Sequence, residues 1–246
     1  MKKTELIMGM PITVEIIDSD NRNLLTETFS FFKDIDNRYS TYKPNSEISR
    51  INNGLPRALW STEMKHIVHL CEQTKQQTMG YFDIKHNGKL DPSGLVKGWA
   101  IWQASQRLLE EHEIKHFYIE AGGDIQAYGN NAERKPWTVG IRNPNNPSEI
   151  IKSLILKNQG VATSGTYIRG QHIYDPHHPT TTPKGVKSLT VIGSNIYEAD
   201  RFATASFAMG AEGINFIESA DNLEGYMVNN EGIATFTSGF KEYIYA

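Results

Sequence analysis

The sequence is poor in cysteine, in net charge and in long apolar runs. Among its 246 residues Cys71 is the single cysteine, so an internal disulfide is impossible, and its helical-looking surroundings predict a packed, inert thiol. The formal charge is −3 and no broad basic excess is visible, which argues against a nucleic-acid partner. No stretch approaches the roughly 18 apolar residues that a membrane-spanning helix needs. These absences leave a soluble globular protein, with charged residues at an ordinary 22%.

The N-terminus begins with two lysines, as a signal peptide does. Glu5, Gly9 and Pro11 interrupt the apolar run that follows, so it is not an export signal. We therefore expect the mature chain to begin at Met1 and the protein to be cytoplasmic. A chain from which an export signal had been trimmed would have the same sequence.

Apolar residues at helical spacing and β-branched runs alternate irregularly along the chain. Helices are expected at about 21–37, 61–78, 93–112, Glu198–Met209 and Ile214–Glu218. Strands are expected at Pro11–Ile17, Phe117–Ala121, Trp137–Ile141, Ile151–Leu156, Val161–Thr163, His172–Tyr174, Ser188–Ile192, Tyr226–Val228, Ile233–Phe236 and Tyr243–Tyr245. This order predicts an α+β fold of mixed β-sheets with packed helices, in a single compact domain over residues 1–246. Neither a Rossmann nor a P-loop glycine motif is present.

The stretch from Asp91 to Trp99 has the features of a helix start that binds phosphate. Asp91 is a good N-cap, Pro92 suits the first helical position, and Gly94 leaves the first turn open. With Lys97 one turn later, backbone N–H groups and an ammonium group could hold an anion. A well-capped surface helix with a solvated lysine would explain the same residues.

Asp200 and Thr204 are four residues apart, so a helix places both on one face among Ala, Phe and Met side chains. A carboxylate in apolar surroundings needs a cation or hydrogen bonds. A set of oxygen ligands suits Mg²⁺ or Ca²⁺ better than a softer metal. The alternative is that Asp200 is only a helix N-cap.

Residues 160–167 combine glycine with small hydroxyl side chains, which can form an anion-binding turn. His172 follows, just before an Asp-Pro turn, and could act as an acid or base near neutral pH. His177 and His178 lie close behind, but no spaced cysteine or acidic partner supports a zinc site.

Glycines in Glu120–Ile125 follow a strand, where they allow the close approach of a ring or simply form a tight turn. Aromatic side chains stand beside polar ones in Gly80–Asp83 and Ser40–Tyr42. These aromatics could stack on a nucleobase or a flavin, although such residues more often pack in the core.

Taken in order, these motifs resemble the ApbE family of FAD:protein FMN transferases. The resemblance covers about residues 8 to 210 and rests mainly on Asp-x-x-Gly-x-x-Lys-Gly at 91–98, Ala-Thr-Ser-Gly at 162–165 and Ala-Asp-x-x-Ala-Thr-Ala at 199–205. It also includes Met8-Gly9, Ser40–Tyr42, Ser46–Ile48, Gly80–Asp83, Gly122–Asp124 and His172–Pro176.

The resemblance implies the following site. Asp200, the Thr204 side chain and a backbone carbonyl at or next to Gly94 would bind Mg²⁺. The FAD site would be lined by Met8, Tyr42, Tyr81, Phe82, Asp83, Asp91, Lys97, His172 and Ile173. His172 and Asp200 are the catalytic candidates, with His172 beside the flavin phosphates as the acid–base residue and Asp175 or Asp200 as alternative bases.

The implied reaction cleaves the pyrophosphate of FAD and joins FMN through a phosphoester to a Ser or Thr of another protein, with release of AMP. Mg²⁺ would neutralise charge on the phosphate oxygens. The expected acceptor is a flavoprotein of an electron-transfer or reductase system, with its Ser or Thr in a short motif near a Gly-Ala pair. The alternatives are an FAD pyrophosphatase that yields FMN and AMP, and a non-catalytic flavin-binding protein.

The chain departs from the family pattern at three places. Family members usually carry a longer segment where only seven residues separate Asp83 from Asp91, which puts the adenine contacts in question. His177-His178 stands where Thr-Gly is usual. Arg201 follows Asp200 where a small or apolar residue is common, and it could reach a phosphate or an acidic target.

Overall fold

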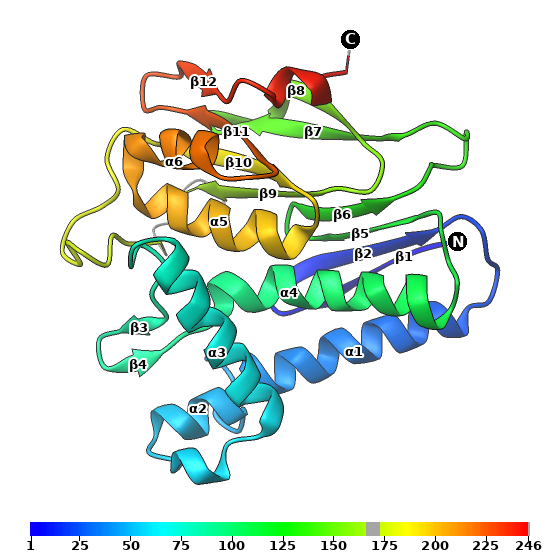
Figure 1. The fold of residues 1–246 in the computed structure, drawn as a ribbon. Coiled ribbons are helices and arrows are strands. Elements are labelled where there is room, and N and C mark those ends of the chain that lie inside the picture. The colour runs from blue at the N-terminus through cyan, green and yellow to red at the C-terminus, as the bar shows by residue number, and fades with distance from the viewer. Residues whose placement is uncertain (166–172, 246) are drawn as a thin grey trace.

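The computed structural model describes residues 1–165 and 173–245 (Figure 1). Its strands are β1 (Lys2–Ile7), β2 (Met10–Ile16), β3 (Lys85–His86), β4 (Lys89–Leu90), β5 (Phe117–Ala121), β6 (Asp124–Tyr128), β7 (Trp137–Asn143), β8 (Asn146–Leu156), β9 (Gly160–Gly165), β10 (Ser188–Gly193), β11 (Leu223–Val228) and β12 (Ala234–Phe236). Its helices are α1 (Asn23–Tyr39), α2 (Glu47–Asn52), η1 (Arg57–Leu59), α3 (Thr62–Gln77), α4 (Ser93–Gln106), the π-helical turn η2 (Arg107–Glu111), α5 (Ile196–Ala208), η3 (Gly210–Glu212), α6 (Gly213–Ser219) and η4 (Phe240–Tyr243).

Eight strands form one sheet in the order β1-β2-β5-β6-β9-β10-β11-β12, and the neighbours pair antiparallel throughout the described chain. Two hairpins, β3–β4 and β7–β8, stand apart from this sheet. The turn between β5 and β6 consists of Gly122 and Gly123, both with positive φ (60° and 99°), and Ala121 pairs with Asp124 across it. Two such residues are what a tight two-residue hairpin requires.

Both faces of the sheet are covered. Successive residues of a strand point to opposite faces, so a strand buried on both sides can bury apolar residues at consecutive positions. In β10, Val191 packs into the core beneath the helices, whereas Ile192 packs into a second core with Trp137 of β7 and Phe240 of η4. Figure 1 shows α4, α5 and α6 along one side of the sheet and the β7–β8 hairpin with η4 on the other. The site is therefore built on the helical side.

Most of the expected elements are confirmed, and the α+β class is confirmed as well. The expected strand at Tyr243–Tyr245 is wrong, because the chain forms the helical turn η4 there and only Ile244 makes an isolated bridge, to Leu154. The expected strand at 172–174 is wrong for its described residues, which lie in an irregular segment, and His172 lies outside the described residues.

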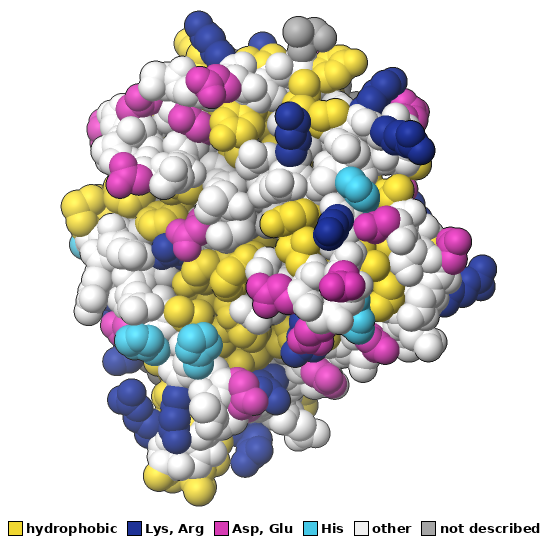
Figure 2. Space-filling view, turned by 45° about the vertical axis from the view of Figure 1, so that its right-hand side comes forward, with side chains coloured by type: hydrophobic (Ala, Val, Ile, Leu, Met, Phe, Trp, Pro, Cys, Tyr) yellow, Lys and Arg dark blue, Asp and Glu magenta, His cyan; other side chains and the backbone are white. Residues whose placement is uncertain are grey.

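The surface carries mixed charge. In the face shown in Figure 2, acidic and basic side chains are interspersed around a band of exposed hydrophobic groups. Within the described residues, no helix is long and apolar enough to cross a membrane.

Cys71 lies on the buried side of α3 and is 2% exposed. Burial raises the pKa of its thiol, and the nearby Glu72 acts in the same direction. Because the thiolate is the reactive form, we expect the native protein to react with an aromatic disulfide reagent at pH 8 at least about 100-fold more slowly than the same protein in guanidinium chloride. Absorbance of the released thiolate measures both rates. Rapid labelling of the native protein would contradict this packing.

Candidate active site

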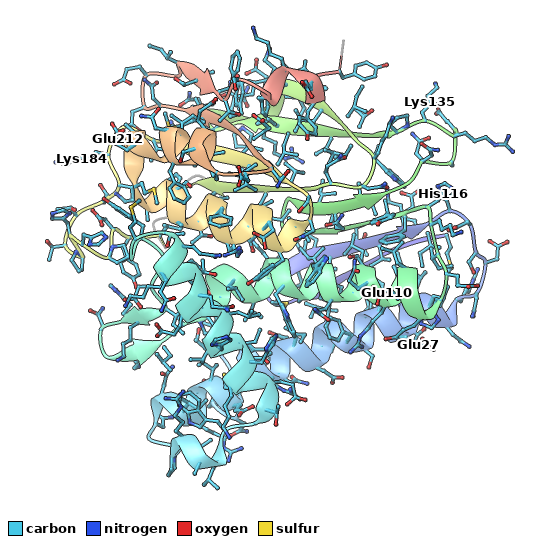
Figure 3. The ribbon with its side chains drawn as sticks, in the orientation of Figure 1. Glu27, Glu110, His116, Lys135, Lys184 and Glu212 are labelled. Atoms are coloured by element: carbon cyan, nitrogen blue, oxygen red, sulfur yellow. The ribbon has the colours of Figure 1, made fainter. Side chains whose placement is uncertain are left out.

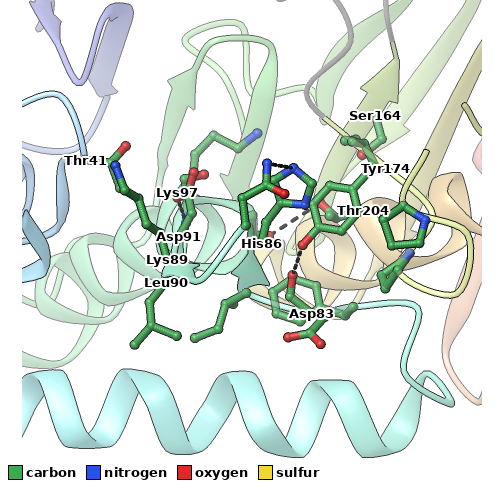
Figure 4. A pocket seen from close by; sticks show the side chains of 18 of the residues that line it. Thr41, Asp83, His86, Lys89, Leu90, Asp91, Lys97, Ser164, Tyr174 and Thr204 are labelled. Carbon is green, nitrogen blue, oxygen red and sulfur yellow. Dashed lines mark hydrogen bonds between the residues drawn. The ribbon is translucent and has the colours of Figure 1, made fainter. Parts of the chain in front are cut away.

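A large cavity of about 1100 Å³ opens on the helical side of the sheet. Its walls come from the start of α4, the middle of α5, the β3–β4 hairpin, the ends of β5 and β9, and the segment 173–182 (Figure 4). Ten of the residues that the resemblance implies line it: Tyr42, Tyr81, Phe82, Asp83, Asp91, Gly94, Lys97, Ile173, Asp200 and Thr204. Segments far apart in the sequence thus meet around one space large enough for a dinucleotide-sized ligand.

Of the other implied residues, one lies away from the cavity and one is not described. Met8 is in the β1–β2 turn with a φ of 57°, packs against the main core and is not among the cavity-lining residues. His172 lies outside the described residues, so its role stays a prediction. Among the lining residues Tyr42 stands apart, since it is 97% exposed at the rim, whereas Phe82 is buried.

Helices α4 and α5 cross at closely matched positions. Gly94 of α4 faces Thr204 of α5, and Gly98 faces Asp200. The two glycines are one helical turn apart, and so are Asp200 and Thr204. A Cβ on Gly98 would lie 2.6 Å from the Asp200 Cβ and 2.8 Å from the Ile196 carbonyl oxygen, so only glycine permits this approach. The Gly98 N–H donates a hydrogen bond of 2.8 Å to Asp200 Oδ2. The Asp200 carboxylate is thereby fixed in orientation against the start of α4.

Asp200 lies in the middle of α5 and is 3% exposed, so the helix N-cap alternative is wrong, and Asn195 occupies that position instead. Burial raises the pKa of Asp200 to about 7, because Lys97 and the Gly98 N–H lower it less than burial and the neighbouring Asp124 raise it. Lys97 forms ion pairs with Asp124 and, at 3.3 Å, with Asp200 Oδ1. Lys97 alone thus supplies too little positive charge to keep the Asp200 carboxyl group fully ionised near neutral pH.

The oxygen atoms near Asp200 fit a hard divalent cation. The Thr204 Oγ1 donates a long hydrogen bond of 3.4 Å to the Gly94 carbonyl oxygen, and both residues line the cavity with Asp200. A carboxylate, a hydroxyl and a carbonyl are ligands that Mg²⁺ accepts when phosphate or water completes its coordination. Within the described residues no group of three His, Cys, Asp or Glu side chains could hold a metal, which disfavours a zinc-type site.

The start of α4 differs slightly from the expected N-cap. The helix begins at Ser93 with Pro92 as the capping residue, and Asp91 Oδ1 accepts a hydrogen bond of 3.0 Å from the Ser93 N–H. Asp91 therefore closes the turn before the helix. Both Ser93 and Gly94 line the cavity, so the first turn faces the ligand space.

Residues 160–165 are the strand β9 and not the expected anion-binding turn, because they pair with β10 along their whole length. Thr163 and Ser164 nevertheless line the cavity at the end of this strand. The backbone N–H of Thr163 donates to Asp124 Oδ1 at 3.0 Å. Asp124 was not among the candidate residues, although its position directly after two glycines at a strand end was a usable signal.

The short link between Asp83 and Asp91 folds as the β3–β4 hairpin. Its turn residues Asn87 and Gly88 both have positive φ (50° and 75°), and an Asn-Gly pair is the strongest short hairpin signal. Asn52 of α2 fixes the far strand, accepting from the Leu90 N–H at 2.8 Å and donating to the Leu90 carbonyl at 2.9 Å. The hairpin thus forms a firm wall of the cavity.

Tyr174 fixes the near strand of this hairpin from the other side. Its hydroxyl donates to the carbonyl oxygens of Asp83 (2.9 Å) and Lys85 (3.2 Å), and its ring lies 4.0 Å from the His86 ring (Figure 4). Burial raises the pKa of Tyr174 to about 12, helped by Asp83 and Asp91, so the hydroxyl stays protonated and keeps donating.

The histidines after Asp175 contact the same wall. His177 meets the edge of the Tyr81 ring at 4.5 Å, and its Nε2 lies 3.0 Å from the Met79 carbonyl oxygen. Burial acts against ionisation of Asp175, but hydrogen bonds from His178 and the His177 N–H lower its pKa overall. A carboxylate with a lowered pKa is a poor proton acceptor, which makes Asp175 a weak alternative base.

Arg201 does not reach the cavity, so its expected contact with a phosphate or an acidic target is wrong. It is 6% exposed and forms an ion pair with Glu198 at 2.5 Å. Its guanidinium group also donates to Thr74 and Gln77 of α3. The residue therefore links α5 to α3.

Some titratable side chains lie away from the cavity. Figure 3 labels Glu27, Glu110, His116, Lys135, Lys184 and Glu212, and none of them lines the cavity. His116 has a structural contact, since its Nδ1 accepts a hydrogen bond of 2.9 Å from the Asn130 N–H.

Replacing Asn52 by alanine is expected to release the β3–β4 hairpin. The loss of two hydrogen bonds should lower the free energy of unfolding by about 1–2 kcal/mol, and the affinity for FAD should fall several-fold because the hairpin lines the cavity. Denaturant unfolding and flavin fluorescence titration measure the two effects. Asn53→Ala is the matched control, since Asn53 also lines the cavity but makes no contact with Leu90. Equal effects of both variants would contradict the role given to Asn52.

Comparison with known proteins gives the same family as the motifs. A FAD:protein FMN transferase of Haemophilus influenzae is 29% identical over 62% of this chain and 48% of its own length. One from Vibrio cholerae is 24% identical over 96% of this chain and 88% of its length. The chain spans about half the length of most of the curated relatives that it matches, and these relatives carry the same name.

Solved structures share the fold. A flavin transferase ApbE from Vibrio cholerae superposes with a TM-score of 0.86, at 21% identity and with 99% and 98% of the two chains covered. The ApbE protein from Thermotoga maritima gives 0.87, at 21% identity and with 100% and 99% covered. The sequence model of the ApbE family matches residues 8–88 and 85–227. Since this match covers most of the chain, the protein belongs to the ApbE family.

Proposed function

We propose that this protein is a Mg²⁺-dependent FAD:protein FMN transferase. It would cleave the pyrophosphate of FAD and link FMN through a phosphoester to a Ser or Thr of an acceptor flavoprotein, with AMP as the second product. The observation that carries the proposal is the oxygen cluster of the buried Asp200 with the half-buried Thr204 and Gly94, beside Lys97, in a cavity of about 1100 Å³. Family membership and relatives that carry this name support it.

One set of residues would bind the pyrophosphate of FAD, and another set would bind its ring systems. The first turn of α4 and Lys97 line the cavity, and a pyrophosphate there would gain both a helix N-terminus and a positive charge. Tyr81, Tyr42 and the His86–Tyr174 pair offer aromatic surfaces for the ring systems. Met8 and His172 remain part of the proposed FAD site on the strength of the resemblance alone.

Asp200, Thr204 and the Gly94 carbonyl would hold Mg²⁺, which supplies charge neutralisation at the phosphate oxygens when bound. In the transfer step, the acceptor hydroxyl oxygen forms a bond to the FMN phosphorus while the bond from that phosphorus to the bridging oxygen breaks. The oxygen leaves with AMP. His172 is the proposed acceptor of the hydroxyl proton, with Asp175 or Asp200 as the alternatives.

The acceptor is proposed to be a flavoprotein of an electron-transfer or reductase system, with its Ser or Thr near a Gly-Ala pair. The chain from 1 to 246 is proposed to act as one ApbE-like domain, and the cytoplasmic location stays a prediction.

The test uses the purified protein with FAD, MgCl₂ and a candidate acceptor domain, followed by intact-mass measurement of the acceptor. Addition of one FMN that requires Mg²⁺ supports the transferase. Release of FMN and AMP without addition, for every acceptor tried, would favour the pyrophosphatase. FAD that stays intact but bound would leave a flavin-binding protein.

A further inference from the structure

Lys97 lies between two buried carboxylates, and only one of these belongs to the proposed metal site. Its side chain is 17% exposed, against 2% for Asp124 and 4% for Asp200. The closer contact is with Asp124 Oδ2, and the contact with Asp200 Oδ1 is longer, at 3.3 Å. Of these two contacts, the shorter is thus with the carboxylate that is not a proposed metal ligand.

The two carboxylates are fixed by backbone groups of different elements. Asp124 is the first residue of β6, directly after the Gly122–Gly123 turn, and its Oδ1 accepts from the Thr163 N–H at 3.0 Å. The other oxygen atom, Asp124 Oδ2, therefore faces Lys97 and pairs with it. In Asp200 the Gly98 N–H binds Oδ2, which leaves Oδ1 toward Lys97.

An ammonium group and a metal ion compete for the same carboxylate oxygen. When both carboxylates are ionised, they leave a net negative charge beside the one ammonium group, which favours a divalent cation in a poorly solvated site. If Asp124 were neutral, Asp200 would be the remaining carboxylate that pairs with Lys97 among the described residues. The lysine would then neutralise Asp200 itself, and a metal would have to displace it.

We propose that Asp124 is a positioning residue that retains the Lys97 ammonium group and thereby leaves Asp200 Oδ1 available to Mg²⁺. This inference rests on the proposed metal role of Asp200. It assigns to the glycine turn between β5 and β6 a function beyond chain reversal, because that turn sets where Asp124 begins β6.

The experiment is a double-mutant cycle on the full chain, with the Kd for Mg²⁺ measured by calorimetry from MgCl₂ titrations. Asp124→Asn should raise the Kd on the order of tenfold, equivalent to about 1.4 kcal/mol. Lys97→Gln should lower the Kd, because it removes the competing cation. On the Lys97→Gln background, the rise in Kd caused by Asp124→Asn should be roughly tenfold smaller than with Lys97 present, so the Kd should hardly change.

Glu120→Gln is the matched control. It removes one negative charge from the same hairpin, and a glutamine oxygen can still accept the hydrogen bond of the Gly123 N–H that Glu120 accepts at 2.8 Å. Its effect on the Kd should stay within about threefold, as expected for a partly solvated charge. A crystal structure of Asp124→Asn should place the Lys97 ammonium group within hydrogen-bond distance of Asp200 Oδ1.

Equal costs of Asp124→Asn on both backgrounds would overturn the inference, since a simple loss of charge acts whether or not Lys97 is present. If Asp124→Asn fails to fold, the Lys97→Gln protein decides, because an unchanged or higher Kd there overturns the inference. Asp200→Asn distinguishes a failure of the role of Asp124 from a failure of the proposed metal site. Mg²⁺ binding that depends on Asp200 but not on Asp124 removes only this inference, and binding that does not depend on Asp200 removes the proposed metal site as well.

Discussion

Asp200→Asn is expected to reduce the rate of FMN transfer by at least about a hundredfold, the range found when a metal ligand or its support is lost. The asparagine side chain keeps the shape and can still accept the Gly98 N–H hydrogen bond, but it carries no charge for a cation. The fold should therefore survive, with a melting temperature near that of the unchanged protein. The rate is measured by intact mass of the acceptor at saturating FAD and several Mg²⁺ concentrations.

Glu198→Gln is the control for Asp200→Asn. Glu198 lies on the same helix, its carboxylate binds Arg201, and it does not line the cavity. A glutamine oxygen can still accept from the guanidinium group, so the transfer rate should change by less than about threefold. If Asp200→Asn kept a comparable rate with an unchanged Mg²⁺ dependence, the metal site would have to lie elsewhere.

Gly98→Ala is expected to damage both the fold and the site. The added Cβ would lie 2.6 Å from the Asp200 Cβ and 2.8 Å from the Ile196 carbonyl oxygen, distances that force α4 and α5 apart. Overpacking of this kind costs typically about 1–3 kcal/mol, and the clash must also outweigh the gain of about 1 kcal/mol that alanine brings to a helix interior. We therefore expect a net loss of up to about 2 kcal/mol in the free energy of unfolding, with FMN transfer strongly reduced because Asp200 is displaced.

Urea unfolding and the transfer assay measure the two effects of Gly98→Ala. Gln103→Ala is the control, since it places an alanine on the same helix at a half-buried position away from the cavity. It should leave transfer unchanged and stability within about 0.5 kcal/mol. A Gly98→Ala protein as stable and active as this control would show that the helix crossing tolerates a larger separation.

Local patterns predicted much of the fold. The helices α1, α3 and α5 were expected close to their observed bounds because a buried helical face repeats every three to four residues. The edge strand β1 was missed, because five of its six residues have no buried side chain and Lys2 and Glu5 form surface ion pairs instead. A polar edge strand carries little alternation, so only its pairing with β2 reveals it.

The hairpin β3–β4 was also missed, although Asn87-Gly88 was a visible signal. Each of its strands has two residues, too short for an apolar pattern. A last strand was expected at Tyr243–Tyr245. There the chain instead forms η4, and Phe240 of η4 fills the second core.

The sequence by itself determined the oxygen pair of Asp200 and Thr204, the glycine-and-lysine start of α4 and the order of motifs that defines the family. These features depend on residues within one or two helical turns, where spacing along the chain fixes spacing in space. Only the tertiary structure decided that Asp124 meets Lys97, that Arg201 is buried against α3, and that Met8 lies off the cavity. The reason is physical: strand pairing and the close crossing of α4 on α5 set these contacts, and both depend on packing between segments that are remote along the chain.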